Sequence, residues 1–141
     1  MFKIISHTAD IGIEVEAVDW EQLFKEAARG WKALVFEDSS IQGKENKPVN
    51  LEAQTVEELL VDWLNELNYF LTVHFWVFDK VLNLRISQTG EKGWKLQAEV
   101  SGEPYNQDRH YIYFDIKAVT FHQLQIRYDN GKLKTRIFFD I

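Results

Sequence analysis

Carboxylates near both ends of the chain are the residues best suited to bind a metal ion. Asp10 closes the segment His7-Thr8-Ala9-Asp10, and Asp140 is followed by the last residue, Ile141. The Asp140 side chain and the Ile141 α-carboxylate are two anions one residue apart, which repel each other unless a cation offsets them. A hard divalent ion with oxygen ligands is one such cation. From the residues alone, a turn role for Asp10 and a hydrated terminal pair are the simpler interpretation.

The four histidines do not form a recognisable zinc motif. His7, His74, His110 and His122 show no HxxxH or HxH spacing, and cysteine is absent, so thiolate sites and disulfides are excluded. His122 is more simply interpreted as a buried, hydrogen-bonded histidine at the start of a strand. The sequence also has no Gly-x-Ser-x-Gly, Walker-type or Gly-x-Gly-x-x-Gly motif, which counts against a nucleophilic or nucleotide-binding enzyme.

Charge and hydropathy narrow the class of partner. The net charge is −6 and no dense Lys/Arg run is present, so we expect no direct nucleic-acid binding and favour a protein partner. Glu58, Asp62 and Glu66 recur at i, i+4 spacing; they most simply form a solvated helix face, and docking of a basic partner is the second interpretation. Without a signal peptide or a run of about 18 apolar residues, we expect a cytoplasmic protein with no membrane partner.

The elements that must position these residues follow from apolar periodicity and cap residues. Residues 11–17 alternate as a strand, Asp19 caps a helix that runs to about residue 35, and Thr55 caps a second helix after a strand at 48–54. Strands are expected at 82–86 and 94–100, a polar loop at 101–109, and a hairpin of 121–128 with 133–139 through Asp129-Asn130-Gly131. The segment 110–116 is ambiguous between strand and short helix.

This order predicts one α+β domain over residues 1–141. Two helices would pack on one face of a mixed, largely antiparallel β-sheet. The 141 residues, 45% of them hydrophobic and 14% aromatic, suffice for one large core.

Five blocks, in order along nearly the whole chain, resemble motifs of the archease family. They are His7-Thr8-Ala9-Asp10-Ile11-Gly12-Ile13, the helix segment from Leu59 to Leu67, Gly102-Glu103-Pro104, the segment from Asp115 to His122, and the ending Ile137-Phe138-Phe139-Asp140-Ile141. Two departures stand out: Ser6 replaces a residue that is often acidic in the family, and Asn68-Tyr69-Phe70 replaces a more aliphatic stretch.

The resemblance implies an archease-like fold and an accessory protein, not an enzyme. Archeases assist the RtcB-type tRNA-splicing RNA ligase by promoting its guanylylation and multiple turnover. They bind a divalent cation, most often assigned as calcium, and the matching ligands here are Asp10, Asp140 and Ile141. His7, Lys117 and His122 are the residues expected around that site.

Two alternatives to the family interpretation remain open. One is a general chaperone-like protein-binding module, for which metal would be irrelevant. The other is a small metal-dependent phosphoester hydrolase that would use Asp10, Asp140 and either His7 or His122, and the lack of a recognisable nucleophile counts against it.

Overall fold

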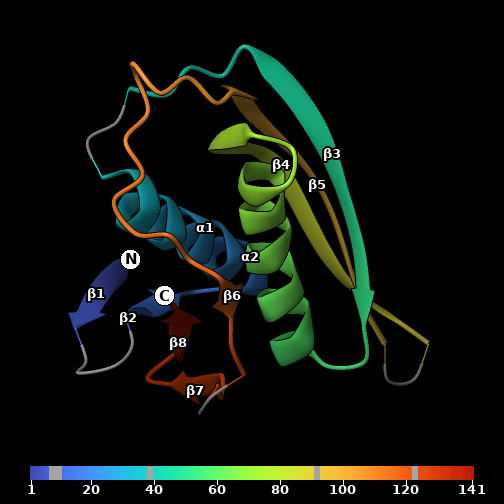
Figure 1. Cartoon of the computed structure of the whole chain (residues 1–141). Helices are drawn as coiled ribbons and strands as arrows, with labels where there is room; N and C mark the ends of the chain where they lie inside the picture. Colours follow the sequence, from blue (N-terminus) through green and yellow to red (C-terminus); the bar gives the residue numbers. More distant parts are fainter. Residues whose placement is uncertain (7–10, 38–39, 91–92, 122–123) are drawn as a thin grey trace.

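The computed structural model describes residues 1–6, 11–37, 40–90, 93–121 and 124–141 (Figure 1). His7, Asp10 and His122 therefore lie outside the described residues. The elements, in chain order, are β1 (Phe2–Ser6), β2 (Ile11–Ala17), α1 (Trp20–Phe36), β3 (Glu45–Ala53), α2 (Val56–Thr72), β4 (Trp76–Thr89), β5 (Gly93–Pro104), β6 (Ala118–Val119), β7 (Arg127–Asp129) and β8 (Lys132–Asp140).

Both helices begin at the cap residues that the sequence predicts. The backbone N–H of Gln22 donates to Asp19 Oδ1 at 2.8 Å, and the N–H of Glu58 donates to Thr55 Oγ1 at 3.1 Å. Each cap satisfies one of the N–H groups that the first helical turn leaves unpaired. The local pattern of a cap followed by an apolar helix face therefore determines where α1 and α2 start.

Removing the α2 cap gives a modest, measurable effect. We expect Thr55→Ala to lower the free energy of unfolding by about 1 kcal/mol, because the Glu58 N–H loses its side-chain acceptor. Urea unfolding followed by circular dichroism measures the change. Ser87→Ala, which removes an exposed hydroxyl on β4, is the matched control and should change stability by less than about 0.5 kcal/mol. Equal losses in the two variants would contradict a capping role for Thr55.

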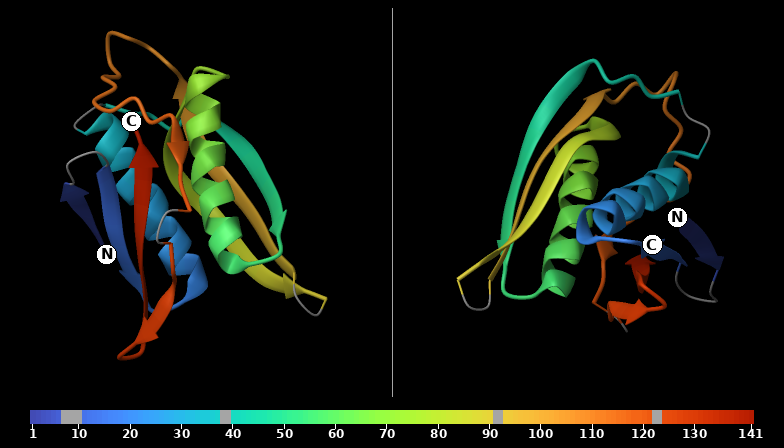
Figure 2. Two further views of the ribbon diagram at one scale, coloured as in Figure 1. Left: turned by 60° about the horizontal axis from the view of Figure 1, so that its bottom comes forward. Right: turned by 180° about the vertical axis from the view of Figure 1, so that it is seen from behind.

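The strands form two antiparallel sheets, which corrects the expectation of a single mixed sheet. One sheet has the order β1-β2-β8-β6, with β7 also paired to β8, and the other has the order β3-β5-β4. The α+β class and the two helices are confirmed. The helices lie between the sheets (Figure 2), since α1 contacts β2 and β4 and α2 contacts β3, β4 and β6. Each helix buries a broad apolar surface and can cover a sheet on either side.

The two central strands of the β1-β2-β8-β6 sheet present their apolar side chains to the helices. Ile11, Ile13, Val15 and Ala17 of β2 are buried. In the antiparallel register they lie opposite Phe139, Ile137, Thr135 and Leu133 of β8, all of which are also buried. The alternation seen in the sequence at 11–17 thus reflects one buried face of the sheet.

Three local predictions need correction. The hairpin turn at Asn130-Gly131 is confirmed, with φ of 53° and 77°, but β7 is only three residues long and the described residues 121 and 124–126 lie outside strands. The expected polar loop at 101–109 instead begins as the buried end of β5. Residues 110–116 form neither helix nor strand. Strand β4 has register shifts between Phe78 and Lys80 and between Val81 and Asn83, which interrupt the regular alternation of its side chains.

No helix among the described residues is long and apolar enough to cross a membrane.

Candidate functional site

The end of β8 is the point at which three segments, distant in sequence, meet. Ile11, the first residue of β2, pairs with Phe139. The end of β2 that follows the segment at 7–10 is therefore the same end of the ladder that carries Asp140. We call this end of β8, with Lys117, Asp140 and Ile141, the tip.

Strand β6 brings Lys117 to the tip from the other side of β8. Ala118 pairs with Asp140 and Val119 with Phe139. The backbone N–H of Lys117 donates to the carbonyl of Asp140 at 2.8 Å, and the N–H of Thr120 donates to the carbonyl of Phe138 at 3.1 Å. Of the expected site residues, the structure therefore brings together Lys117, Asp140 and Ile141.

The donors that the structure describes at the tip suit a hard cation. Asp140 and Ile141 are exposed and carry carboxylate and carbonyl oxygens, the kinds of donor that calcium coordinates. No described cation forms an ion pair with Asp140, so its negative charge is not already offset by the residues the structure describes. Within the described ranges no group of three His, Asp or Glu side chains gathers for a metal, and the third expected ligand, Asp10, lies outside them.

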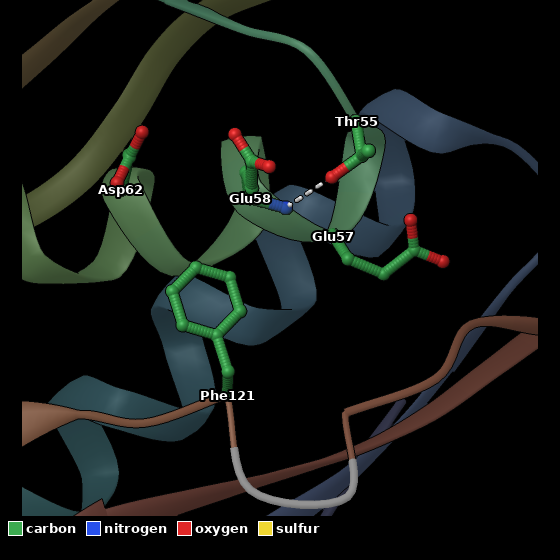
Figure 3. A pocket seen from close by; sticks show the side chains of 5 residues that line it. All are labelled: Thr55, Glu57, Glu58, Asp62 and Phe121. Carbon is green, nitrogen blue, oxygen red and sulfur yellow. Dashed lines mark hydrogen bonds between the residues drawn. The ribbon is translucent and has the colours of Figure 1, made fainter.

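A groove of about 520 Å³ opens between the start of α2 and the residues that follow β6 (Figure 3). Thr55, Glu57, Glu58, Asp62 and Phe121 line it. Partial burial, together with the charge of Glu58, raises the pKa of Asp62. The acidic helix face seen in the sequence therefore borders a hollow. The exposed ring of Phe121 on its other side was not predicted, because that residue was assigned to a strand.

A second charged cluster, which sequence reasoning missed, lies at the end of β5. The Glu103 side chain is only 1% exposed and accepts hydrogen bonds from Arg109 and from the backbone N–H of Gln42. His110 is also buried; its Nδ1 accepts from the N–H of Asn106 at 2.9 Å and its Nε2 lies 3.2 Å from Glu103 Oε2. The only sequence signal was a Glu, an Arg and a His within eight residues of each other.

The cluster keeps Glu103 ionised. The hydrogen bond from Arg109 lowers the Glu103 pKa most; burial opposes it, and the N–H of Gln42 and the ring of His110 reinforce it, to a pKa of about 2. The cluster joins the segment at 40–44 and the loop after β5 to the three-stranded sheet.

Comparison with known proteins decides the family. The family model described as Archease protein family (MTH1598/TM1083) matches residues 2–141. The chain belongs to the archease family. The resemblance seen in the five sequence blocks is thus confirmed.

Relatives and solved structures of this family match over nearly their whole length. The archease of Methanopyrus kandleri is 30% identical over 137 residues, which cover 97% of this chain and 96% of that protein. The archease of Methanosarcina mazei is 33% identical over 143 residues, or 99% of this chain and 95% of that one. The solution structure of Methanobacterium thermoautotrophicum protein 1598 is 28% identical and superposes with a TM-score of 0.84, covering 99% and 98% of the two chains.

A second solved structure is more distant in shape. The crystal structure titled as an archease, possible chaperone, from Thermotoga maritima is 27% identical and has a TM-score of 0.57, covering 99% of this chain and 96% of that one. Both structures support the α+β archease fold.

Proposed function

We propose that this archease is an accessory protein of the RtcB-type tRNA-splicing RNA ligase, without an enzymatic activity of its own. It would promote guanylylation of the ligase and allow multiple turnovers. The observation that carries the proposal is the meeting of β2, β6 and the end of β8, because the three segments that form this junction each adjoin or belong to a block that resembles an archease motif.

The tip is the proposed metal site. Asp10, Asp140 and Ile141 are the proposed ligands of a divalent cation, with calcium expected from the all-oxygen donor set. His7, Lys117 and His122 are the residues proposed to lie around it. A bound cation would offset the negative charge of the carboxylates and hold the segment before β2 against the end of β8.

The proposed action on the ligase is a shift between ligase conformations. Docking of the tip can favour the conformation competent for nucleotidyl transfer only if the archease binds that conformation more tightly than others. The net charge of −6 supports an action on the ligase itself and not on the RNA.

Asp140→Ala tests the proposal in a ligation assay. We expect the wild-type protein to support many turnovers and the variant to lose roughly 100-fold in stimulation, since removing even an indirect support of a metal ligand costs about 10–100-fold. A single round of joining by ligase that is already guanylylated should not change. Asp129→Ala, which removes an exposed carboxylate of β7 opposite the first residue of β8 and so away from the tip, is the matched control. Full turnover support by Asp140→Ala would remove the metal tip from the mechanism.

The Thermotoga maritima structure is described as a possible chaperone, and this description supports a second candidate function. A general chaperone would suppress aggregation of unrelated proteins, and a chelator would make no difference. A ligase activator would stimulate the ligase and leave unrelated clients unaffected. Aggregation assays with and without chelator, run beside the ligation assay, separate the two functions.

A further inference from the structure

Strand β6 is only two residues long, and its two edges bond to different partners. On one edge the N–H groups of Lys117 and Thr120 donate to carbonyls of β8 at 2.8 and 3.1 Å. Helix α2, and not a further strand, lies along the other edge (Figure 1). Backbone groups on that edge need hydrogen-bond partners from helix side chains, because the helix's own backbone groups are paired internally.

Asn65 supplies the partner for Val119. The N–H of Val119 donates to Asn65 Oδ1 at 2.9 Å, and Asn65 Nδ2 donates to the carbonyl of Val119 at 3.5 Å. An amide side chain carries both a donor and an acceptor, so one asparagine serves both backbone groups as a neighbouring strand would.

Asn68 holds the residue just before Lys117. Its Nδ2 donates to the carbonyl of Ile116 at 2.8 Å, and its Oδ1 accepts from Trp31 Nε1 of α1 at 3.3 Å. The residue is only 5% exposed. The residue noted in the sequence as a departure from an aliphatic stretch is therefore a buried link between α1, α2 and the segment that leads into β6.

The two hydrogen bonds from carbonyls of this segment to α2 each have a counterpart on β8. The peptide group between residues 116 and 117 directs its carbonyl to Asn68 and its N–H to the carbonyl of Asp140. The peptide group between residues 119 and 120 directs its carbonyl to Asn65 and its N–H to the carbonyl of Phe138. The two asparagines lie one helical turn apart and so hold both ends of this short strand against the tip.

We propose that Asn65 and Asn68 are positioning residues of the tip: they hold the backbone of residues 116–120, and through the Lys117 N–H they hold Asp140 in the geometry that binds the cation. The inference rests on the proposed function and deepens it. A two-residue ladder has too few hydrogen bonds to fix its own position, so the amides of α2 supply the missing constraint.

Asn65→Asp is the main test, made on the full chain. The substitution keeps the size and one acceptor, removes the donor, and places a carboxylate oxygen against the Val119 carbonyl. We expect faster hydrogen exchange at the Lys117 and Thr120 amides in the metal-free protein, and about ten-fold weaker calcium binding. An added negative charge alone would strengthen calcium binding, so a loss of affinity identifies positioning.

Asn50→Asp on the exposed outer side of β3 is the matched control, because it adds the same charge away from the tip. It should leave both measurements at their wild-type values. Asn65→Ala is a second variant that removes both hydrogen bonds without repulsion and favours the helix. Like Asn65→Asp, it should speed hydrogen exchange at the Lys117 and Thr120 amides and weaken calcium binding. The test therefore remains decisive if Asn65→Asp folds poorly.

Two outcomes overturn the inference, and neither depends on the ligase. One is that the Lys117 and Thr120 amides exchange at the wild-type rate in both Asn65 variants. The other is an equal loss of calcium affinity in Asn50→Asp. A wild-type protein that fails to stimulate the ligase would instead refute the proposed function, and hydrogen exchange in the metal-free protein would still decide whether Asn65 positions the tip.

Discussion

Replacing Glu103 with glutamine should lower the free energy of unfolding by about 3 kcal/mol at pH 7, near the lower end of the range for a broken buried ion pair. Oε2 now accepts from Gln42 and Arg109 and lies against the His110 ring, and Oε1 accepts from Arg109. An amide nitrogen in either place would therefore face at least one N–H donor, and the charge that pairs with Arg109 would be lost. The Arg109 side chain is 30% exposed, so water can partly solvate the charge it leaves behind, which keeps the loss from being larger.

The same carboxylate makes a defined contribution to acid sensitivity. Its pKa is about 2 in the folded protein against an ordinary value of 4.5, so the unfolded chain binds the proton more readily. The stabilising contribution of Glu103 is therefore complete above pH 4.5 and is lost as the pH falls from 4.5 towards 2. The stability difference between wild type and Glu103→Gln should shrink over that interval.

Urea unfolding at pH 7 and at several values below pH 4.5 measures both effects. Glu52→Gln, which neutralises an exposed carboxylate on β3, is the control and should stay within about 0.5 kcal/mol of wild type. A Glu103→Gln protein as stable as wild type at pH 7, or a difference that grows in acid, would mean that the buried cluster does not stabilise the fold.

The part of this fold that could be predicted from sequence is the part that depends on near neighbours. Asp19 and Thr55 cap helices through N–H groups three residues away, and the alternation at 11–17 reflects the two faces of a single strand. The division into two sheets was not predicted, because it depends on which strands pair. Nothing within a strand's own residues specifies its partner.

The functional residues likewise divide into those that near neighbours reveal and those that depend on distant partners. Asp140 was identified because its side chain and the Ile141 α-carboxylate are two anions one residue apart, and the family resemblance joined it to Asp10. The environment of Glu103 was not predicted, because its partners lie 6 residues ahead, at Arg109, and 61 residues back, at Gln42. A polar stretch looks like a solvated loop until the structure shows that its charges are paired and buried. The role of Asn65 was not predicted either, because its hydrogen-bond partner, Val119, lies 54 residues along the chain.

Gly102→Ala should be about as destabilising as the loss of Glu103, by about 3 kcal/mol, because β5 at Gly102 lies beneath an indole ring. Trp76 of β4 reaches over β5, the middle strand, to donate from Nε1 to Glu45 of β3 at 2.9 Å. A Cβ at Gly102 would lie 2.5 Å from Trp76 Cη2 and even closer to the backbone carbonyl of Val77, so either the strands or the indole must move. Overpacking of this kind costs about 1–3 kcal/mol or more.

The cause of that loss can be separated from a general effect on the strand. Trp76→Leu should recover part of the stability lost in Gly102→Ala, because the smaller side chain no longer covers the glycine, and a double-mutant cycle measures the coupling. Gln97→Ala, an exposed change on the same strand, should be close to neutral. Additive losses in the double variant would show that the indole does not impose the requirement for glycine. The carbonyl of Val77 would then be the whole cause, and the Gly-Glu-Pro block would reflect strand spacing alone.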